Sequence, residues 1–178
     1  MSSIDKKLLF ESFFEDSTDG LMILENGRCI ECNQALLDMM GVKQKNFLYG
    51  LLPSDLSPEM QPDGEKSSIK EKKMMRLALM QGSHTFDWVC TGEKENHIWM
   101  NVTMTPISMG FRDIVYVVCR DITRQKEEEK ILKEEKEKLL YLAHNDALTG
   151  LPNRLFFTNR LEQAVSMSKR FTRELALL

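Results

Sequence analysis

The opening of the chain places apolar side chains at the spacing of a helix. Leu9, Phe10, Phe13 and Phe14 fall on one face, so residues 1–15 are predicted to form a helix with an apolar side. We expect this side to lie against the following domain or against a second copy of the chain.

Two short strands and a helix are predicted next. Asn26 and Gly27 separate the apolar residues 21–24 from residues 28–32, and this dipeptide favours a tight turn with positive φ at both positions. Asn33 can then cap a helix by accepting from its free N–H groups. The buried stripe of this helix consists of Leu36, Leu37 and Met40.

A longer helix is predicted after a proline-rich loop at 52–66. Ser68 and Glu71 have the spacing of a capping box, in which two side chains bond to backbone N–H groups at the start of a helix. Gly82 marks its end. The apolar stripe of the helix consists of Met74, Met75, Ala78 and Leu79.

Three strands complete the pattern. Residues 84–91 and 98–106 alternate between apolar and polar positions, whereas residues 114–118 are apolar on both faces, as in a central strand. The order of elements predicts an α+β fold, in which a five-stranded antiparallel sheet carries helices on one face, with an N-terminal helix and a C-terminal helix added.

Composition changes sharply along the chain and divides it into parts. Lys and Glu dominate residues 124–138, and apolar residues return from position 139. We therefore expect an N-terminal helix at 1–15, a domain at 16–123, a charged helical linker at 124–145 and the start of a second domain at 146–178.

Several local patterns in the first domain resemble the PAS family of sensory domains. Residues 19–28, DGLMILENGR, followed by Asn33, resemble the first hairpin and helix of these domains, and residues 82–88 and 99–107 resemble their later strands. The sequence Asp-Ile-Thr at 121–123 resembles the junction at which PAS domains pass into a signalling helix. The resemblance implies a PAS fold over residues 16–123.

A second resemblance begins after the charged linker. Residues 146–154, DALTGLPNR, resemble the motif that opens GGDEF domains, the family of diguanylate cyclases, and this implies a helix at 156–168 and a strand at 174–178. The metal-binding aspartates and the GGDEF loop of that family would follow residue 178. We therefore expect no catalytic residues and no enzyme activity in this chain, and we expect GTP and Mg²⁺ only in a longer parent protein.

The linker is expected to transmit the signal. Leu132 and Leu139 lie seven positions apart, which is a thin coiled-coil seam, although a solvated single helix is the alternative that the charge pattern allows. The resemblance favours a parallel pair of helices and therefore a homodimer. The residues assigned to signal transmission are Asp121, Ile122, Thr123, Leu132, Leu139, Asp146 and Arg154, with the last two expected to brace a turn as a pair.

The residue traces of two common PAS cofactors are missing. The chain lacks the NCRFLQ stretch of flavin-adduct domains, and residues 67–81 contain no histidine, so neither flavin nor haem is expected. The many methionines on apolar faces indicate either ordinary core filling or a pliable pocket for a small apolar or aromatic ligand. The candidate pocket residues are Ile23, Leu36, Met40, Met75, Leu79, Phe86, Trp88, Met100, Val102 and Met104.

The cysteines are interpreted as structural. Cys29 and Cys32 are three positions apart on a predicted strand and should point to opposite faces, so no metal site is expected there. Cys90 and Cys119 are expected to be small core residues. Four cysteines without a signal peptide indicate reduced thiols and a cytoplasmic location.

The net charge and the length of the apolar runs bear on which partners the chain can bind. A net charge of −3 offers no electrostatic basis for binding nucleic acid, and no apolar run reaches the roughly 18 residues of a membrane span, so no membrane contact is expected. The leading interpretation is a sensing and dimerisation module that regulates a C-terminal diguanylate cyclase. The alternatives are a ligand-free structural PAS dimerisation domain, or a parent that is a GGDEF/EAL phosphodiesterase or a degenerate GTP-binding regulator.

Overall fold

The computed structural model describes residues 3–92, 96–109, 112–146 and 148–171. The chain divides into two compact units, Met1–Lys126 and Glu127–Leu178, which are described separately below.

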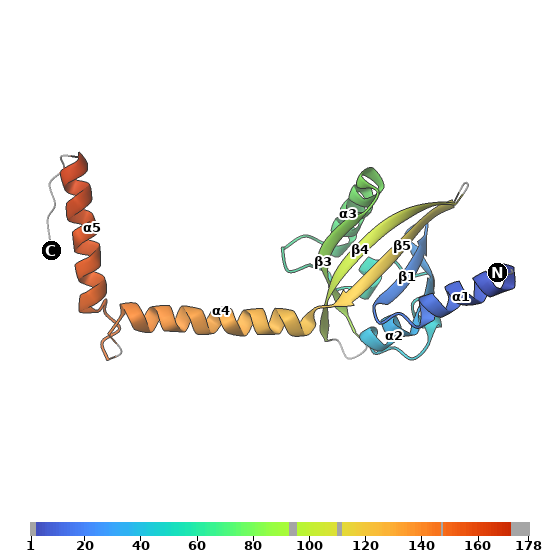
Figure 1. Ribbon diagram of the computed structural model, residues 1–178, viewed down its shortest axis with the longest axis horizontal. Helices are drawn as coiled ribbons and strands as arrows, with labels where there is room; N and C mark the ends of the chain where they lie inside the picture. The colour runs from blue at the N-terminus through green and yellow to red at the C-terminus, as the bar shows by residue number, and fades with distance from the viewer. Residues whose placement is uncertain (1–2, 93–95, 110–111, 147, 172–178) are drawn as a thin grey trace. The chain divides into compact units, whose positions relative to one another are not determined.

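The first unit contains a five-stranded antiparallel sheet, as the sequence predicted. The strands follow the order β2-β1-β5-β4-β3, so β5 pairs with both β1 and β4 in the middle of the sheet (Figure 1). Their bounds are β1 Gly20–Glu25, β2 Arg28–Cys32, β3 His84–Thr91, β4 His97–Met109 and β5 Arg112–Asp121. Strands β4 and β5 are longer than predicted because they pair with each other as far as Met109 and Arg112.

The first hairpin forms as expected. Asn26 has φ +52° and Gly27 has φ +78°, so both turn residues take the left-handed conformation that matches the twist of a tight hairpin.

Two helices of the first unit enclose the core against one face of the sheet. They are α2 (Gln34–Met40) and α3 (Ser67–Gln81), with the short 3₁₀ turns η1 (Lys45–Phe47) and η2 (Pro53–Leu56) between them. The core includes Leu36 and Leu37 from α2 and Ala78 from α3, packed with inward side chains of the sheet. Helix α1 (Ser3–Glu15) precedes β1, and its Phe10 and Phe13 remain exposed.

Asn33 joins the start of α2 to the sheet. Its Oδ1 accepts from the backbone N–H of Leu36, 3.0 Å away, which confirms the predicted helix cap. The same oxygen also accepts from the backbone N–H of Leu21 on β1 at 2.8 Å. The side chain is fully buried, so it satisfies backbone groups that water cannot reach.

The capping box predicted for α3 is wrong. The helix begins at Ser67, and its cap residue is Lys66, two residues before the predicted cap Ser68; Lys66 makes no side-chain cap bond. The Glu71 carboxylate accepts instead from the backbone N–H of Ser54, 3.0 Å away in the loop before the helix. Ser68 and Glu71 have the spacing of a capping box, but the Glu71 side chain contacts the preceding loop instead of its own helix.

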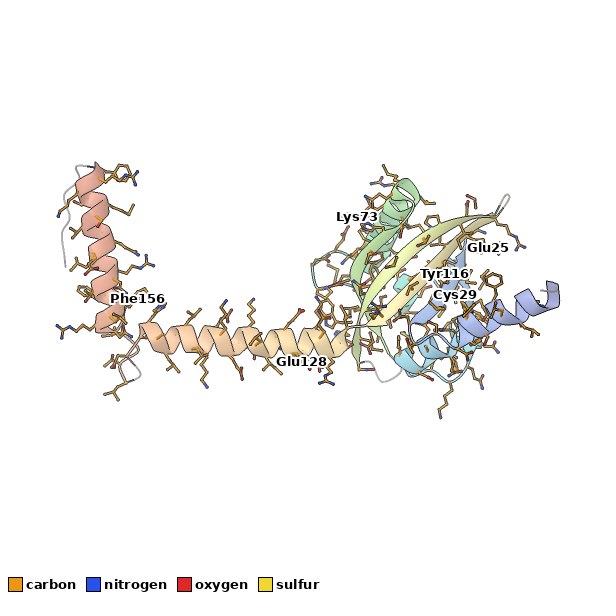
Figure 2. The ribbon with its side chains drawn as sticks, in the orientation of Figure 1. Glu25, Cys29, Lys73, Tyr116, Glu128 and Phe156 are labelled. Carbon is orange, nitrogen blue, oxygen red and sulfur yellow. The ribbon has the colours of Figure 1, made fainter. Side chains whose placement is uncertain are left out.

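The second unit holds most of α4 (Thr123–His144) and all of α5 (Arg154–Phe171), in agreement with the two predicted helices. Side chains project from all sides of α4 (Figure 2), and neither helix has a buried residue. The strand predicted at 174–178 lies outside the described residues. Among the helices that the structure describes, none is both long enough and apolar enough to cross a lipid bilayer.

Candidate ligand cavity and helix junction

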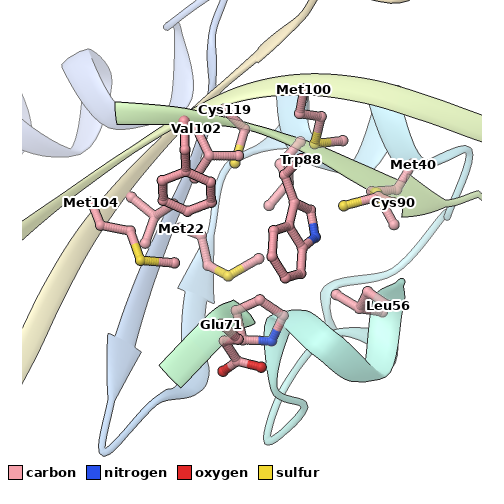
Figure 3. A pocket seen from close by; sticks show the side chains of 14 residues that line it. Met22, Met40, Leu56, Glu71, Trp88, Cys90, Met100, Val102, Met104 and Cys119 are labelled. Carbon is pink, nitrogen blue, oxygen red and sulfur yellow. The ribbon is translucent and has the colours of Figure 1, made fainter. Parts of the chain in front are cut away.

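A small apolar cavity lies between the sheet and the helices of the first unit. Trp88 extends from the sheet across it, towards Leu56 and Glu71 on the opposite side (Figure 3). Its volume is about 40 Å³, which admits water-sized molecules only. Its walls are formed by Met22, Leu36, Met40, Pro53, Leu56, Glu71, Phe86, Trp88, Cys90, Met100, Val102, Met104, Val117 and Cys119.

The polar atoms at the wall are already paired. The indole N–H of Trp88 donates to Ser57 Oγ at 2.8 Å, and that hydroxyl donates to the Pro53 carbonyl at 2.7 Å. Glu71, which is 7% exposed, accepts from the Ser54 N–H. Burial raises the pKa of the Cys90 thiol to about 12, so this side chain stays neutral at physiological pH. The cavity therefore suits an uncharged, largely apolar guest.

Seven of the ten predicted pocket residues line this cavity, and three do not. Ile23 points to the other face of the sheet, because its neighbours Met22 and Leu24 are the inward residues of β1. Leu79 is 60% exposed, and both it and Met75 line an outer groove beside α3 instead. The three predictions fail because an apolar stripe does not show which of its members reach the cavity.

Several residues of the cavity wall were not predicted from the sequence. Met22, Val117 and Cys119 lie on strands that are apolar on both faces, where alternation gives no indication of the inward side. Leu56 and Glu71 reach the cavity only because η2 folds back against α3. In the structure, the pairing of β1 with β5 places Met22 opposite Val117, a relationship that neither segment shows by itself.

The expected orientation of Cys29 and Cys32 is wrong. Both thiols are buried in the same core cluster, with 1% and 0% exposure. The register of β1 and β2 shifts between Ile23 and Leu24, so that Cys32 stands opposite Met22 and Cys29 opposite Leu24. This β-bulge adds one residue to β2 and turns both cysteines to the same face.

The junction with α4 is attached to β4 by backbone groups. The N–H of Ile122 donates to the Trp99 carbonyl at 2.9 Å, and the N–H of Trp99 donates to Thr123 Oγ1 at 3.0 Å. The Asp121 carboxylate accepts from the Thr123 N–H at 2.8 Å, which forms an Asx-turn at the entry to the helix. All three residues of the Asp-Ile-Thr sequence therefore take part in this attachment.

The first turn of α4 also contacts β3. The Lys126 ammonium lies 2.8 Å from Asp87 Oδ2 and 5.5 Å from the centre of the Trp99 ring. The hydrogen bond from Lys126 is the largest of the effects that hold the pKa of Asp87 below its ordinary value. Asp87 is next to Trp88 and Trp99 is next to Met100, so the residues that hold α4 alternate with residues of the cavity wall.

The other residues assigned to signal transmission lie in the second unit. Leu132 and Leu139 are each 67% exposed on α4. The Asp146 carboxylate accepts from the N–H groups of Leu148 and Thr149 and from the Thr149 hydroxyl. Among the described residues it makes no ion pair with Arg154, so the expected pairing is not found. Asn153 helps to close the turn instead, since its side-chain amide donates to the Ala143 carbonyl at 2.7 Å.

Within the described residues, no three His, Cys, Asp or Glu side chains gather as metal ligands would.

The family model described as PAS domain matches residues 18–124. The signaling protein YkoW of Bacillus subtilis (strain 168) is 25% identical over 166 residues, a match that covers 91% of this chain but only 18% of that protein. Among solved structures, a PAS domain from Colwellia psychrerythraea has a TM-score of 0.56 and 18% identity, covering 68% of this chain and 99% of that one. A PAS domain in complex with ethanol, from a LuxR-family transcriptional regulator of Burkholderia thailandensis, has a TM-score of 0.51 and 17% identity, covering 64% and 97%.

Proposed function

Because this chain belongs to the PAS domain family, we propose that residues 18–124 sense a small apolar ligand and pass its presence to α4. One observation carries the proposal. Trp88 and Met100 form part of the cavity wall, and the residues beside them, Asp87 and Trp99, hold the first turn of α4 through Lys126. A guest that moves the wall therefore displaces the attachment of the helix.

The cavity limits the ligand. At about 40 Å³ it is far smaller than the roughly 300–1,000 Å³ of a typical small-molecule site, so a larger guest must displace side chains. Four methionines in its wall, Met22, Met40, Met100 and Met104, are flexible enough to do this. The ethanol held by the Burkholderia thailandensis domain is a small guest of this kind, and in this cavity it too would have to displace side chains. We propose no haem or flavin.

Native mass spectrometry of the chain with small apolar and aromatic compounds, ethanol among them, tests the sensing proposal. We expect an adduct that is lost on denaturing ionisation. Val117→Phe, which fills the cavity, should abolish it, whereas Val118→Phe on the other face of the same strand should not. A wild-type spectrum without any adduct, or an equal adduct in the Val117→Phe variant, would contradict the proposal.

The small cavity also favours a second function, a ligand-free domain that only pairs two copies of the protein. Phe10 and Phe13 on α1 and Leu132 and Leu139 on α4 are exposed apolar residues that a second copy can cover. A homodimer that binds none of the compounds would support this function. A monomer at micromolar concentration would exclude stable pairing through these residues.

We propose that the output in the parent protein is a diguanylate cyclase domain that begins at Asp146. The support is the DALTGLPNR sequence at 146–154. Catalysis by that domain would use GTP and Mg²⁺. Four free cysteines agree with action in the cytoplasm.

The test of the output is to incubate the full-length parent with GTP and Mg²⁺ and to identify the product. Cyclic di-GMP is expected, with a rate that changes in a Lys126→Met variant. Hydrolysis of cyclic di-GMP would instead indicate a phosphodiesterase parent, and binding of GTP without turnover would indicate a degenerate regulator.

A further inference from the structure

The bulge in β2 gives Cys29 and Cys32 the spacing of a disulfide. Their partners Leu24 and Met22 are two positions apart on β1. Because of the bulge, the three residues from Cys29 to Cys32 therefore span only the length of two ordinary strand residues. At about 3.3 Å per residue, the two Cα atoms are then about 6.6 Å apart. Cα atoms joined by disulfides usually lie about 4.4–6.8 Å apart.

The two thiols are buried in the same core cluster on one face of β2, and Cys29 Sγ donates to the Glu31 carbonyl at 3.7 Å. The adjacent Cys29 thiol lowers the pKa of Cys32, and the nearby Lys45 ammonium lowers it further. The adjacent Cys32 thiol, followed by burial, raises the pKa of Cys29. Cys32 is therefore the thiol that ionises first and is the nucleophile of the pair.

We propose that Cys29 and Cys32 form a redox site that a peroxide converts reversibly to a disulfide. The Cys32 thiolate attacks one peroxide oxygen, the O–O bond breaks, and the products are a sulfenic acid and a hydroxide ion, which becomes water by taking up the proton that Cys32 released. The Cys29 sulfur then attacks the sulfenic sulfur, the S–S bond forms, and the hydroxyl leaves as a second water. Two thiols lose two electrons and one peroxide gains them.

The site lies where the first unit can respond to oxidation. Strand β2 is at the edge of the sheet, where local opening admits a small oxidant to buried thiols. The backbone of Cys29 pairs with the loop at 50–51, with its N–H donating to the Leu51 carbonyl at 2.9 Å. That loop leads directly into η2, which supplies Pro53 and Leu56 to the cavity wall. The proposal rests on strand geometry and does not depend on a cavity ligand.

The other two cysteines provide an internal control. Cys90 on β3 and Cys119 on β5 are also buried, but β4 lies between their strands. The backbones of these two residues are therefore at least two strand spacings apart, about 9.6 Å, which is too far for a disulfide. Burial also raises the pKa of both thiols.

The experiment treats the folded chain with hydrogen peroxide, alkylates it after unfolding, and digests it with trypsin. Cleavage after Arg28 and Lys43 yields one peptide with Cys29 and Cys32 and no other cysteine. We expect this peptide to lose the mass of two hydrogen atoms and to take no alkyl label, until a reductant restores two labels. Cys90 and Cys119 should keep theirs. Retention of both labels on the 29–43 peptide, or a disulfide that forms only in the unfolded chain, would overturn the proposal.

Two isosteric variants test the roles of the thiols. In Cys29→Ser, a sulfenic acid should accumulate at Cys32 and react with dimedone. In Cys32→Ser, Cys29 should stay unreactive to dimedone at the same peroxide concentration. Equal dimedone labelling of the two variants would overturn the assignment of the nucleophile.

Discussion

The guanidinium of Arg120 forms a two-point ion pair with the carboxylate of Asp19, with Nε 3.0 Å from Oδ1 and Nη2 2.7 Å from Oδ2. It joins the end of β5 to the residue before β1, where the sheet passes into the junction with α4. The ion pair therefore holds the beginning and the end of the domain together beside this junction.

The Asp19–Arg120 pair should make stability depend on pH. The hydrogen bond from Arg120 lowers the pKa of Asp19 in the folded state, so the pair stabilises the fold above the ordinary carboxyl pKa and loses its effect as pH falls through the lowered value. Asp19→Asn should lower the free energy of unfolding at pH 7 only slightly, because Arg120 is largely exposed and water screens the pair. Urea unfolding of both proteins between pH 7 and pH 2 should show the difference vanish at low pH. A difference that stays constant would contradict this.

Loss of the Lys126 contact should loosen the start of α4. Lys126→Met removes the ion pair with Asp87, which is worth about 0.2–1 kcal/mol in a partly exposed setting, and should leave the sheet intact. Hydrogen exchange of the amides at 123–128 should become faster. Lys73→Met, which removes the comparable Lys73–Glu65 pair on α3, is the control and should leave these amides unchanged. Unchanged exchange in the Lys126→Met variant would show that the pair does not hold the helix.

Removal of the Asn33 side chain should be among the costlier substitutions. Asn33→Ala leaves the N–H groups of Leu21 and Leu36 without their acceptor, and the carbonyls of Phe14 and Asp19 without their donor. We expect a loss of about 2–4 kcal/mol in the free energy of urea unfolding. Asn153→Ala, at the half-buried cap of α5 in the second unit, should leave the unfolding of the first unit unchanged. A loss below about 1 kcal/mol for Asn33→Ala would mean that water replaces the lost bonds.

Enlargement of the cavity should create a site that can be measured. Met100 is 1% exposed in the cavity wall, so Met100→Ala should reduce stability by about 2–5 kcal/mol. Benzene should then raise the melting temperature of this variant, because an apolar cavity of sufficient size binds apolar guests. Met80→Ala, at a position that is 77% exposed, should change neither stability nor the response to benzene. A similar loss for both variants would contradict the assignment of Met100 to the wall.

Patterns within a single segment were predicted well. Residues 84–91 alternate, and the structure has β3 at the same bounds. Asn33 caps α2, and Gly82 ends α3 with φ +79°. These features depend on backbone geometry and on neighbouring hydrogen bonds, which a short stretch of sequence contains in full.

Features that need a distant partner were decided by the tertiary structure. The bulge that turns Cys29 and Cys32 to one face arises from the pairing of β2 with β1. Glu71 bonds to Ser54 rather than capping its own helix, because the loop before α3 folds against it. Local patterns of residues were enough to predict the helices, the strands and the family to which the chain belongs. Only the packed chain decided which side chains meet, because a contact depends on where two remote segments lie in space.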